Sequence, residues 1–477
     1  MTDRIKNFES CVNSLKIIFY SLSILLFFLS FVLGFDGWKS ALSLSAMISV
    51  VLSVHSAGAL AVTLSSLFLM LGFAALWKAG VTADVYLSSF GGMLNLLALF
   101  AIIPLLAIPI RIGGYGNAIQ MMMESKIKSP FHFYRSISLF SYFLSSFMNL
   151  AALPLMYYSV NKTVGTLPIR LPTRYASTGI IHGYALPILW SPIAPIVGVV
   201  FDITHVEWSA IFPYLLLLSF VGLLLDWGLY RVNRHRIEDF PSYPVHPQSN
   251  AEVSVTEEDS RVSSQNGKKP FMQMGFAVLL FISATMMMEH YFSLGLIATV
   301  IILTLPFSFL WSLVIGQAGQ FGKELKAHVH TQLPKMSDQF LVFLSAGFLV
   351  TAIQTTDHHV LINQWVMHLN HFVGPHLFLM LLPLIPLLLA FVGMHPALAI
   401  SLLAESLDPF SLGLTPEQLA IALLGGAVCT FMLGPFNATL GVMSSITNTA
   451  SLRIMTWNIG FTSVFLGSIT LALFFFT

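Results

Sequence analysis

Two stretches of the chain combine helix-breaking residues with small polar side chains inside long apolar segments. The first is centred on Ser191-Pro192, and the second on Gly434-Pro435, continuing to Asn437 and Thr439. Proline removes a backbone donor and glycine loosens a helix, so backbone groups near each break lack intrahelical partners. At membrane depth such backbone is tolerated only where it is buried in protein or lines a cavity. The breaks therefore predict a binding site in which freed carbonyls and side-chain oxygens suit a small cation and half-helix N-termini suit an anion.

Two predicted turns add further candidates to this site. Ser146 and Asn149 lie in the first turn, and His395 lies in the second. We expect Asn149 and Asn437 to be the ligands if the coupling ion is Na⁺, and we predict no other metal site. His395 could pair with a carboxylate or take a coupling proton, the alternative being a neutral histidine that satisfies loop carbonyls. A serine or threonine in a membrane helix can equally serve helix packing, so both interpretations stay open for each of them.

Composition sets the class of protein. Of the 477 residues, 56% are hydrophobic and 9% are charged, and the mean hydropathy is +0.81. No soluble domain could bury so much apolar surface, so the chain is predicted to be an all-α polytopic membrane protein. We find no HExxH, GxSxG or paired acids at membrane depth, which argues against an enzyme. We expect no cofactor and no nucleic-acid partner.

Apolar runs of membrane-crossing length predict about eleven spanning helices and two shorter re-entrant hairpins. The helices are expected near residues 17–35, 40–55, 58–77, 86–110, 177–201, 209–230, 271–289, 291–316, 336–355, 417–447 and 454–477. The hairpins are expected near 136–160 and 376–404, each preceded by a connecting arm, 113–135 and 356–375.

The distribution of positive charge predicts the topology. If residues 40–77 form two helices, every basic residue except Lys39 and Lys78 lies on one side of the membrane. Basic residues favour the cytoplasmic side, so the N-terminus is expected in the cytoplasm and the C-terminus outside.

The two halves of the chain are predicted to be inverted repeats. Residues 1–38 form an N-terminal tail and a first helix, and the repeats cover 39–231 and 271–477. A shift of about 243 positions places Ser191-Pro192 on Gly434-Pro435 and Gly183 on Gly426. Residues 232–270, rich in Pro, Ser, Asn, Glu and Lys, are expected to be a cytoplasmic linker. Paired interrupted helices of this kind are typical of transporter binding sites.

This arrangement resembles the ion transporter superfamily, which includes divalent anion/sodium symporters and the large membrane subunit of TRAP transporters. The resemblance is carried by residues 145–154 as a first hairpin tip, by Ser191-Pro192 and by residues 434–439. The Ser-Asn-Thr signature of the symporter branch is absent, because the first tip has Met148-Asn149-Leu150 and the second has Gly393-Met394-His395-Pro396.

The resemblance implies a secondary active transporter of the cell inner membrane that works by an elevator motion and forms a homodimer through its outer helices. Its partners would be a small anionic substrate, such as a carboxylate, and the lipid bilayer, and its coupling ion Na⁺ or H⁺. An antiporter or exporter of Na⁺/H⁺ or of an oxyanion is the alternative. It is less favoured, because antiporters usually have buried acids in the broken helices and here only Asp202, near the outer end, qualifies. An additional extracytoplasmic binding protein stays an open question.

Two groups of polar residues outside the breaks are interpreted as structural. Asp226, near the inner end of its helix and close to Arg231, is expected to reach the interface or to form an ion pair. Residues 357–359, together with His368, His371 and His376, resemble a metal cluster only in composition. Because they lack a known ligand spacing, we expect a solvated outer loop there.

Overall fold

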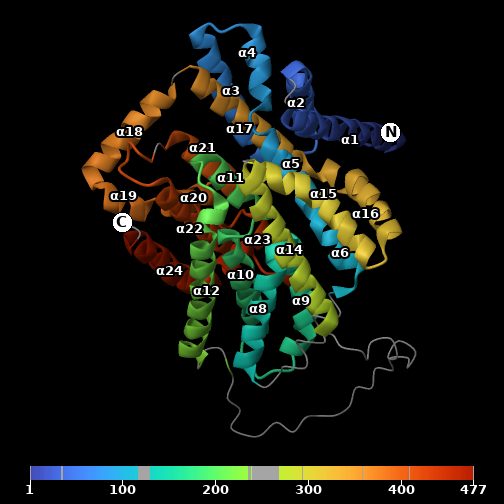
Figure 1. Cartoon of the computed structure of the whole chain (residues 1–477), viewed down its shortest axis with the longest axis vertical. Helices are drawn as coiled ribbons and strands as arrows, with labels where there is room; N and C mark the ends of the chain where they lie inside the picture. The colour runs from blue at the N-terminus through green and yellow to red at the C-terminus, as the bar shows by residue number, and fades with distance from the viewer. Residues whose placement is uncertain are drawn as a thin grey trace.

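The computed structural model describes residues 2–33, 36–115, 129–234, 238, 268–292, 294–356, 358–407 and 409–475. Throughout these ranges the chain is helical, without a strand, which confirms the all-α membrane fold (Figure 1). In the same ranges, 10 helical segments are long and apolar enough to cross a membrane, one fewer than predicted. Most of the predicted linker lies outside the described residues.

The helices that precede the hairpins come from both halves and pack against one another. In the first half they are α1 (Thr2–Leu33), α2 (Lys39–Val54) and α3 (Ala59–Ala79), so residues 40–77 form two helices as predicted. In the second half they are α14 (Lys268–Phe292), α15 (Leu296–Val314) and α17 (Ser337–Thr355). Helix α17 packs against α2 and α3, and the rings of Tyr20 and Phe340 stack 3.7 Å apart. These contacts join the outer helices of the two halves.

The segment expected as one helix at 86–110 is broken into three helices. They are α4 (Ala83–Ser88), α5 (Leu94–Ile102) and α6 (Ala107–Ile112), joined by the 3₁₀ turns η2 (Ser89–Gly91) and η3 (Ile103–Leu106). A Cβ at Gly92 would lie 2.9 Å from the carbonyl oxygen of Gly347. The chain therefore bends where glycine allows it to approach α17 closely, and again at Pro104.

The first half ends with a hairpin, a broken helix and a single helix. The hairpin is α8 (Pro130–Met148), the turn η4 (Asn149–Ala151) and α9 (Ala152–Val164). The broken helix is α10 (Pro172–Ala185), η5 (Leu186–Leu189) and, after an irregular stretch, α11 (Pro195–Thr204). Helix α12 (Trp208–Val232) completes this half.

The second half ends in the same order. Its hairpin is α19 (Pro375–Leu381), α20 (Leu384–Phe391) and α21 (Pro396–Ser406), followed by the broken helix α22 (Pro416–Leu433) and α23 (Ala438–Thr447), and then by α24 (Ser451–Phe475). Two helices were not predicted. The arm expected at 356–375 is mostly the helix α18 (His358–Val373), and α16 (Ala318–Thr331) precedes α17.

Two glycines occupy corresponding positions in the two halves. A Cβ at Gly183 would lie 2.2 Å from the carbonyl oxygen of Ser138, in the first helix of the first hairpin. A Cβ at Gly426 would lie 2.5 Å from the carbonyl oxygen of Pro383, in the corresponding part of the second hairpin. In each half, the broken helix therefore contacts the hairpin of the same half through backbone atoms. The two contacts occur at Gly183 and Gly426, which the shift of about 243 positions aligns.

The two halves also exchange partners. Helix α9, the return helix of the first hairpin, packs against α23 of the second half, and α21 packs against α11 of the first half. In Figure 1 the labels of α10, α11 and α20 to α23 lie in the middle of the molecule. The hairpins and broken helices thus form one central body.

Candidate functional site

The first hairpin tip closes onto the first helix break. The hydroxyl of Ser191 donates a hydrogen bond to the carbonyl oxygen of Ser146 at 2.8 Å. The hydroxyl of Ser146 donates to the carbonyl oxygen of Phe143 at 2.7 Å. Both serines are buried, and Pro192, next in the chain, has no amide hydrogen to donate. The structure therefore brings Ser146 and Ser191-Pro192 together.

The last helix of each half supplies donors to carbonyls that the breaks leave without helical partners. In α12, Ser219 donates to the carbonyl oxygen of Leu186 at 2.9 Å, and Trp208 donates through Nε1 to that of Trp190 at 2.9 Å. In α24, Asn458 donates through Nδ2 to the carbonyl oxygen of Met432 at 3.2 Å. These bonds stabilise irregular backbone that would otherwise be buried unsatisfied.

Asn437 holds the second break in shape. It is the N-cap of α23, where its Oδ1 accepts the amide hydrogen of Leu440 at 2.9 Å. Its Nδ2 donates to the carbonyl oxygen of Thr430 at 2.7 Å, across the break. A Cβ at Gly434 would lie 2.9 Å from that same carbonyl oxygen. Asn437 and Gly434-Pro435 therefore form one compact turn at the start of the α23 half-helix.

Tyr184 joins the first hairpin tip to the second broken helix. Its hydroxyl donates to Oδ1 of Asn149 at 3.0 Å, and Asn149 has a left-handed φ of 48°. The side chain of Thr439 interacts with the Tyr184 hydroxyl. Thr439 is fully buried, and its hydroxyl meets the geometry of a hydrogen bond with none of the described residues. Tyr184 was not predicted as a site residue, because a tyrosine in an apolar helix does not by itself indicate a binding site.

His395 lies at the tip of the second hairpin with its ring between two phenylalanines. Its Nδ1 accepts the amide hydrogen of Ala397 at 3.2 Å. The ring centroids of Phe100 on α5 and Phe343 on α17 lie 5.6 Å from that of His395. Because Nδ1 is an acceptor, the neutral imidazole carries its hydrogen on Nε2. These contacts connect His395 to α5 and α17.

Asp226 does not reach the interface, and its partner is a histidine and not Arg231. Its side chain is 2% exposed, and its Oδ1 accepts from the Tyr134 hydroxyl at 2.8 Å and pairs with His182 Nδ1 at 2.7 Å. Arg231 instead lies over the ring of Phe131, 5.5 Å from its centroid. An acid inside an apolar helix was the available signal, but its histidine partner is 44 residues away in the chain.

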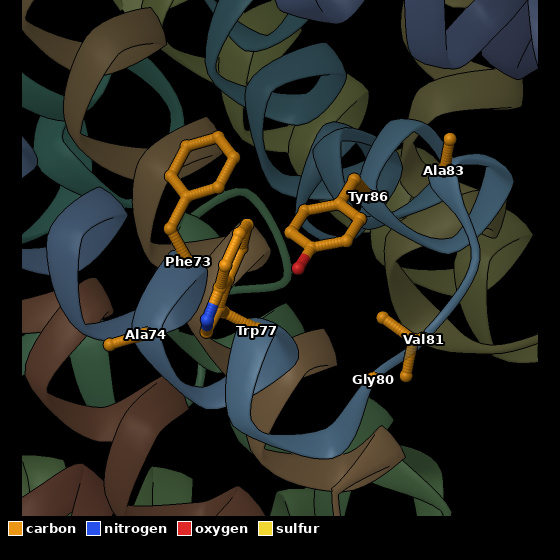
Figure 2. Close-up of a pocket in the computed structure, with 7 residues that line it drawn as sticks. All are labelled: Phe73, Ala74, Trp77, Gly80, Val81, Ala83 and Tyr86. Carbon is orange, nitrogen blue, oxygen red and sulfur yellow. The ribbon is translucent and has the colours of Figure 1, made fainter.

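A hollow lies at the turn between α3 and α4, and its lining is aromatic. Figure 2 shows the ring of Trp77 standing between those of Phe73 and Tyr86. The side chain of Trp77 is 81% exposed, and no lining residue carries a charge. Tryptophan and tyrosine are enriched where helices leave a membrane, so this hollow is assigned to the lipid interface and not to the candidate site.

The histidine-rich stretch from residue 358 onward gives no metal site within the described part of the chain, and residues 358–373 form α18 and not the expected loop. Asp357 and the side chains of His358 and His359 lie outside the described residues. Among the side chains that the structure does describe, no group of three His, Cys, Asp or Glu could hold a metal ion.

Comparison with known proteins identifies the fold. No protein-family model matches the chain, and no curated protein matches it. The structure is similar to that of the Alcanivorax borkumensis YdaH transporter, which is described as having an unusual topology, with a TM-score of 0.60 and 14% sequence identity. The match covers 86% of this chain and 97% of the transporter chain. At this identity the likeness concerns the fold, so the chain has the fold of a membrane transporter.

Proposed function

We propose that this protein is a secondary active transporter that moves a small organic anion, such as a carboxylate, together with a coupling ion. Substrate would be carried by an elevator motion of the hairpins and broken helices against the outer helices. The proposal places the protein in the cell inner membrane, as a homodimer with its N-terminus in the cytoplasm and its C-terminus outside.

One observation carries this proposal. Tyr184 bonds to Asn149 and interacts with Thr439, so three elements from two halves meet at polar groups, and the Tyr184 and Thr439 side chains are buried. Polar groups are expensive inside a membrane protein and are commonly functional there. The buried Thr439 hydroxyl makes no hydrogen bond of standard geometry with a described residue, so it keeps hydrogen-bonding capacity beside Tyr184. The fold of a known transporter supports the same interpretation.

The candidate site suits an anion that is held without basic side chains. The two breaks, 190–194 and 434–437, and the two tips, 146–151 and 392–396, contain no Lys or Arg. The half-helices α11 and α23 both begin at the breaks, and a helix N-terminus attracts negative charge. His395 adds an Nε2 hydrogen that can be donated to a carboxylate.

The coupling ion is Na⁺ or H⁺. For Na⁺, the ligands would be the amide oxygens of Asn149 and Asn437, but each already accepts a hydrogen bond, from Tyr184 and Leu440 respectively. A sodium ion would have to share these oxygens, which makes a proton the simpler choice. An exporter or antiporter remains the second candidate, because Asp202, an acid in the broken-helix segment α11, accepts a hydrogen bond from the neutral side chain of Asn95 at 3.2 Å.

Uptake into proteoliposomes tests the proposal. Purified protein is reconstituted and supplied with radiolabelled benzoate, succinate, glutamate or citrate, with no gradient, a sodium gradient or a pH gradient. We expect at least one carboxylate to enter faster than into protein-free liposomes. If none enters under any gradient, the organic-anion assignment is wrong. Loss of a preloaded carboxylate driven by an inward gradient would favour the exporter.

A further inference from the structure

A buried acid, an imidazole and a phenol meet outside the candidate substrate site. Asp226 on α12, His182 on α10 and Tyr134 on α8 come from three helices, and the His182 and Asp226 side chains are 5% and 2% exposed. Both His182 Nδ1 and the Tyr134 hydroxyl lie within 2.8 Å of Asp226 Oδ1. A buried carboxylate that receives two hydrogen bonds is stabilised in its charged form.

The hydrogen bonds define where a proton can bind. The carboxylate of Asp226 can only accept, so His182 Nδ1 carries the hydrogen between them. In neutral His182 this leaves Nε2 as an unprotonated base, oriented by an acid on the other side of the ring, as in catalytic dyads. Neither Nε2 of His182 nor Oδ2 of Asp226 has a hydrogen-bond partner among the described residues. A proton taken up at Nε2 produces an imidazolium beside a carboxylate, and no other bond changes.

A cavity of about 330 Å³ reaches this pair. It is lined by His182 and Asp226 and extends to Arg174 near the start of α10 and Asn233 at the end of α12. The charge distribution predicts these helix ends on the cytoplasmic side. Water in the cavity would give protons a route between the cytoplasm and the pair.

The charges around the pair allow it to change its protonation state. The other titratable lining residues are Tyr134, Arg174, Tyr175 and Tyr230, and the lining residues from α24, which include Trp457 and Phe461, are uncharged. The Tyr230 hydroxyl donates to Glu238 at 3.1 Å. The ionisable side chains outside the lining, on the helices packed against α10, are His132, Arg135 and Tyr142 on α8, Tyr157, Tyr158 and Lys162 on α9, Tyr214 and Arg231 on α12, Glu417 and Cys429 on α22, and Arg453 on α24. Arg174 is the only permanent charge in the lining, and Glu238, which the lining residue Tyr230 contacts, also contributes to the local field.

The pair is mechanically connected to the candidate substrate site. His182 and Tyr184 lie two positions apart on α10, on either side of Gly183, whose Cβ would lie 2.2 Å from the Ser138 carbonyl oxygen. Helix α10 therefore cannot move past α8 without changing both the Asp226 and the Asn149 contacts. We propose that the His182–Asp226 pair is a proton-binding site through which protons from this cavity are coupled to transport.

Proton binding can be tested without a substrate. The chain has 15 histidines, so full-length protein carrying ¹³C-labelled histidine is studied by NMR, and the His182 signal is assigned by its loss in His182→Gln. We expect this signal to move between about pH 5 and 8, the range in which histidine changes charge. Asp226→Asn should move the midpoint by about one pH unit or more. A His182 signal that does not change in this range overturns the proposal.

Matched variants separate the pair from general effects of burial. Glu289→Gln changes another buried acid, which accepts the amide hydrogens of Trp208 and Ser209 at 3.0 and 3.2 Å. His328→Gln changes a histidine that bonds the Ala101 carbonyl oxygen at 2.9 Å. Both should leave the His182 midpoint where it is in the wild type. An equal movement of the midpoint in either control overturns the assignment of Asp226 as the partner.

Coupling rests on the proposed transport function and is measured separately. Proteoliposomes enclosing a pH-sensitive dye, at equal pH on both sides, receive benzoate, succinate, glutamate or citrate outside. In the wild type, entry of a transported carboxylate should acidify the interior, whereas His182→Gln should lose this acidification and keep exchange of labelled for unlabelled carboxylate. Wild-type acidification in His182→Gln overturns the coupling role. If no carboxylate enters in the wild type, the transport proposal fails, and the NMR titration still decides whether the pair binds a proton.

Discussion

The hydroxyl of Tyr184 donates a hydrogen bond of 3.0 Å to Oδ1 of Asn149, and thereby fixes the tip of one hairpin to the helix that leads into the first break. Asn149 needs this support, because its φ of 48° is unusual for a residue other than glycine. Since Thr439 of the second half interacts with the same hydroxyl, Tyr184 is the residue through which the two halves meet in the candidate site.

Tyr184→Phe should weaken transport more than it weakens the fold. Loss of one neutral hydrogen bond should lower the free energy of unfolding by about 0.5–1.5 kcal/mol, whereas the hairpin tip loses its attachment to α10. We expect a clear fall in carboxylate uptake at wild-type expression. Tyr158→Phe, at a tyrosine that is 66% exposed on the same hairpin, is the control. Equal uptake by both variants would remove Tyr184 from the site.

Gly183→Ala and Gly426→Ala should both destabilise the protein. A methyl group at either position would overlap a hairpin carbonyl oxygen, at 2.2 and 2.5 Å. Overpacking of this kind costs about 1–3 kcal/mol. Gly467→Ala, in α24 with no atom near the added Cβ, should unfold like the wild type in thermal denaturation in detergent. Equal melting temperatures for all three variants would contradict the close approach of broken helix and hairpin.

His395→Asn and His395→Gln should differ. An asparagine oxygen can replace Nδ1 and keep the bond from the Ala397 amide, but it removes the donor at Nε2. We expect His395→Asn to keep the wild-type melting temperature while raising the KM for carboxylate roughly tenfold, which corresponds to about 1.4 kcal/mol. His395→Gln, which places a donor near the Nε2 position, should raise the KM less. An unchanged KM in His395→Asn would leave His395 with a capping role only.

Sodium should not raise the melting temperature more than potassium does at equal ionic strength. An ion that binds only the folded state raises the melting temperature by mass action. We expect no such binding of sodium, because the oxygens of Asn149 and Asn437 already accept hydrogen bonds. The measurement compares thermal unfolding in the two salts. A sodium-specific rise that disappears in Asn437→Ala, which removes the amide oxygen, would establish a sodium site at the second break.

Much of the fold follows from local signals in the sequence. Gly434-Pro435 and Ser191-Pro192 mark the two breaks because proline and glycine cannot continue a regular helix. The spacing of Gly183 and Gly426 predicted the repeat, and the structure places both glycines against hairpin backbone. The three pieces of the helix at 86–110 were less predictable, because its bend depends on contact between Gly92 and α17.

The candidate site was less accessible to sequence reasoning. Asn437 was predicted as a ligand because of its side-chain oxygen. In the structure this residue caps α23, and both its Oδ1 and its Nδ2 are hydrogen-bonded to backbone groups. The partner of Asp226 could not be found, because the packing of α10 against α12 decides which residue reaches it. Side chains that are adjacent only after folding leave no pattern in the sequence.

The most direct test of the account is the steady-state accumulation of a carboxylate in proteoliposomes against its own concentration gradient, driven by an imposed pH gradient. A coupled transporter should hold the internal concentration above the external one for as long as the gradient lasts, and should lose this accumulation when a protonophore is added. Equal concentrations on both sides, reached at the same rate with and without the gradient, would indicate passive movement and contradict the account.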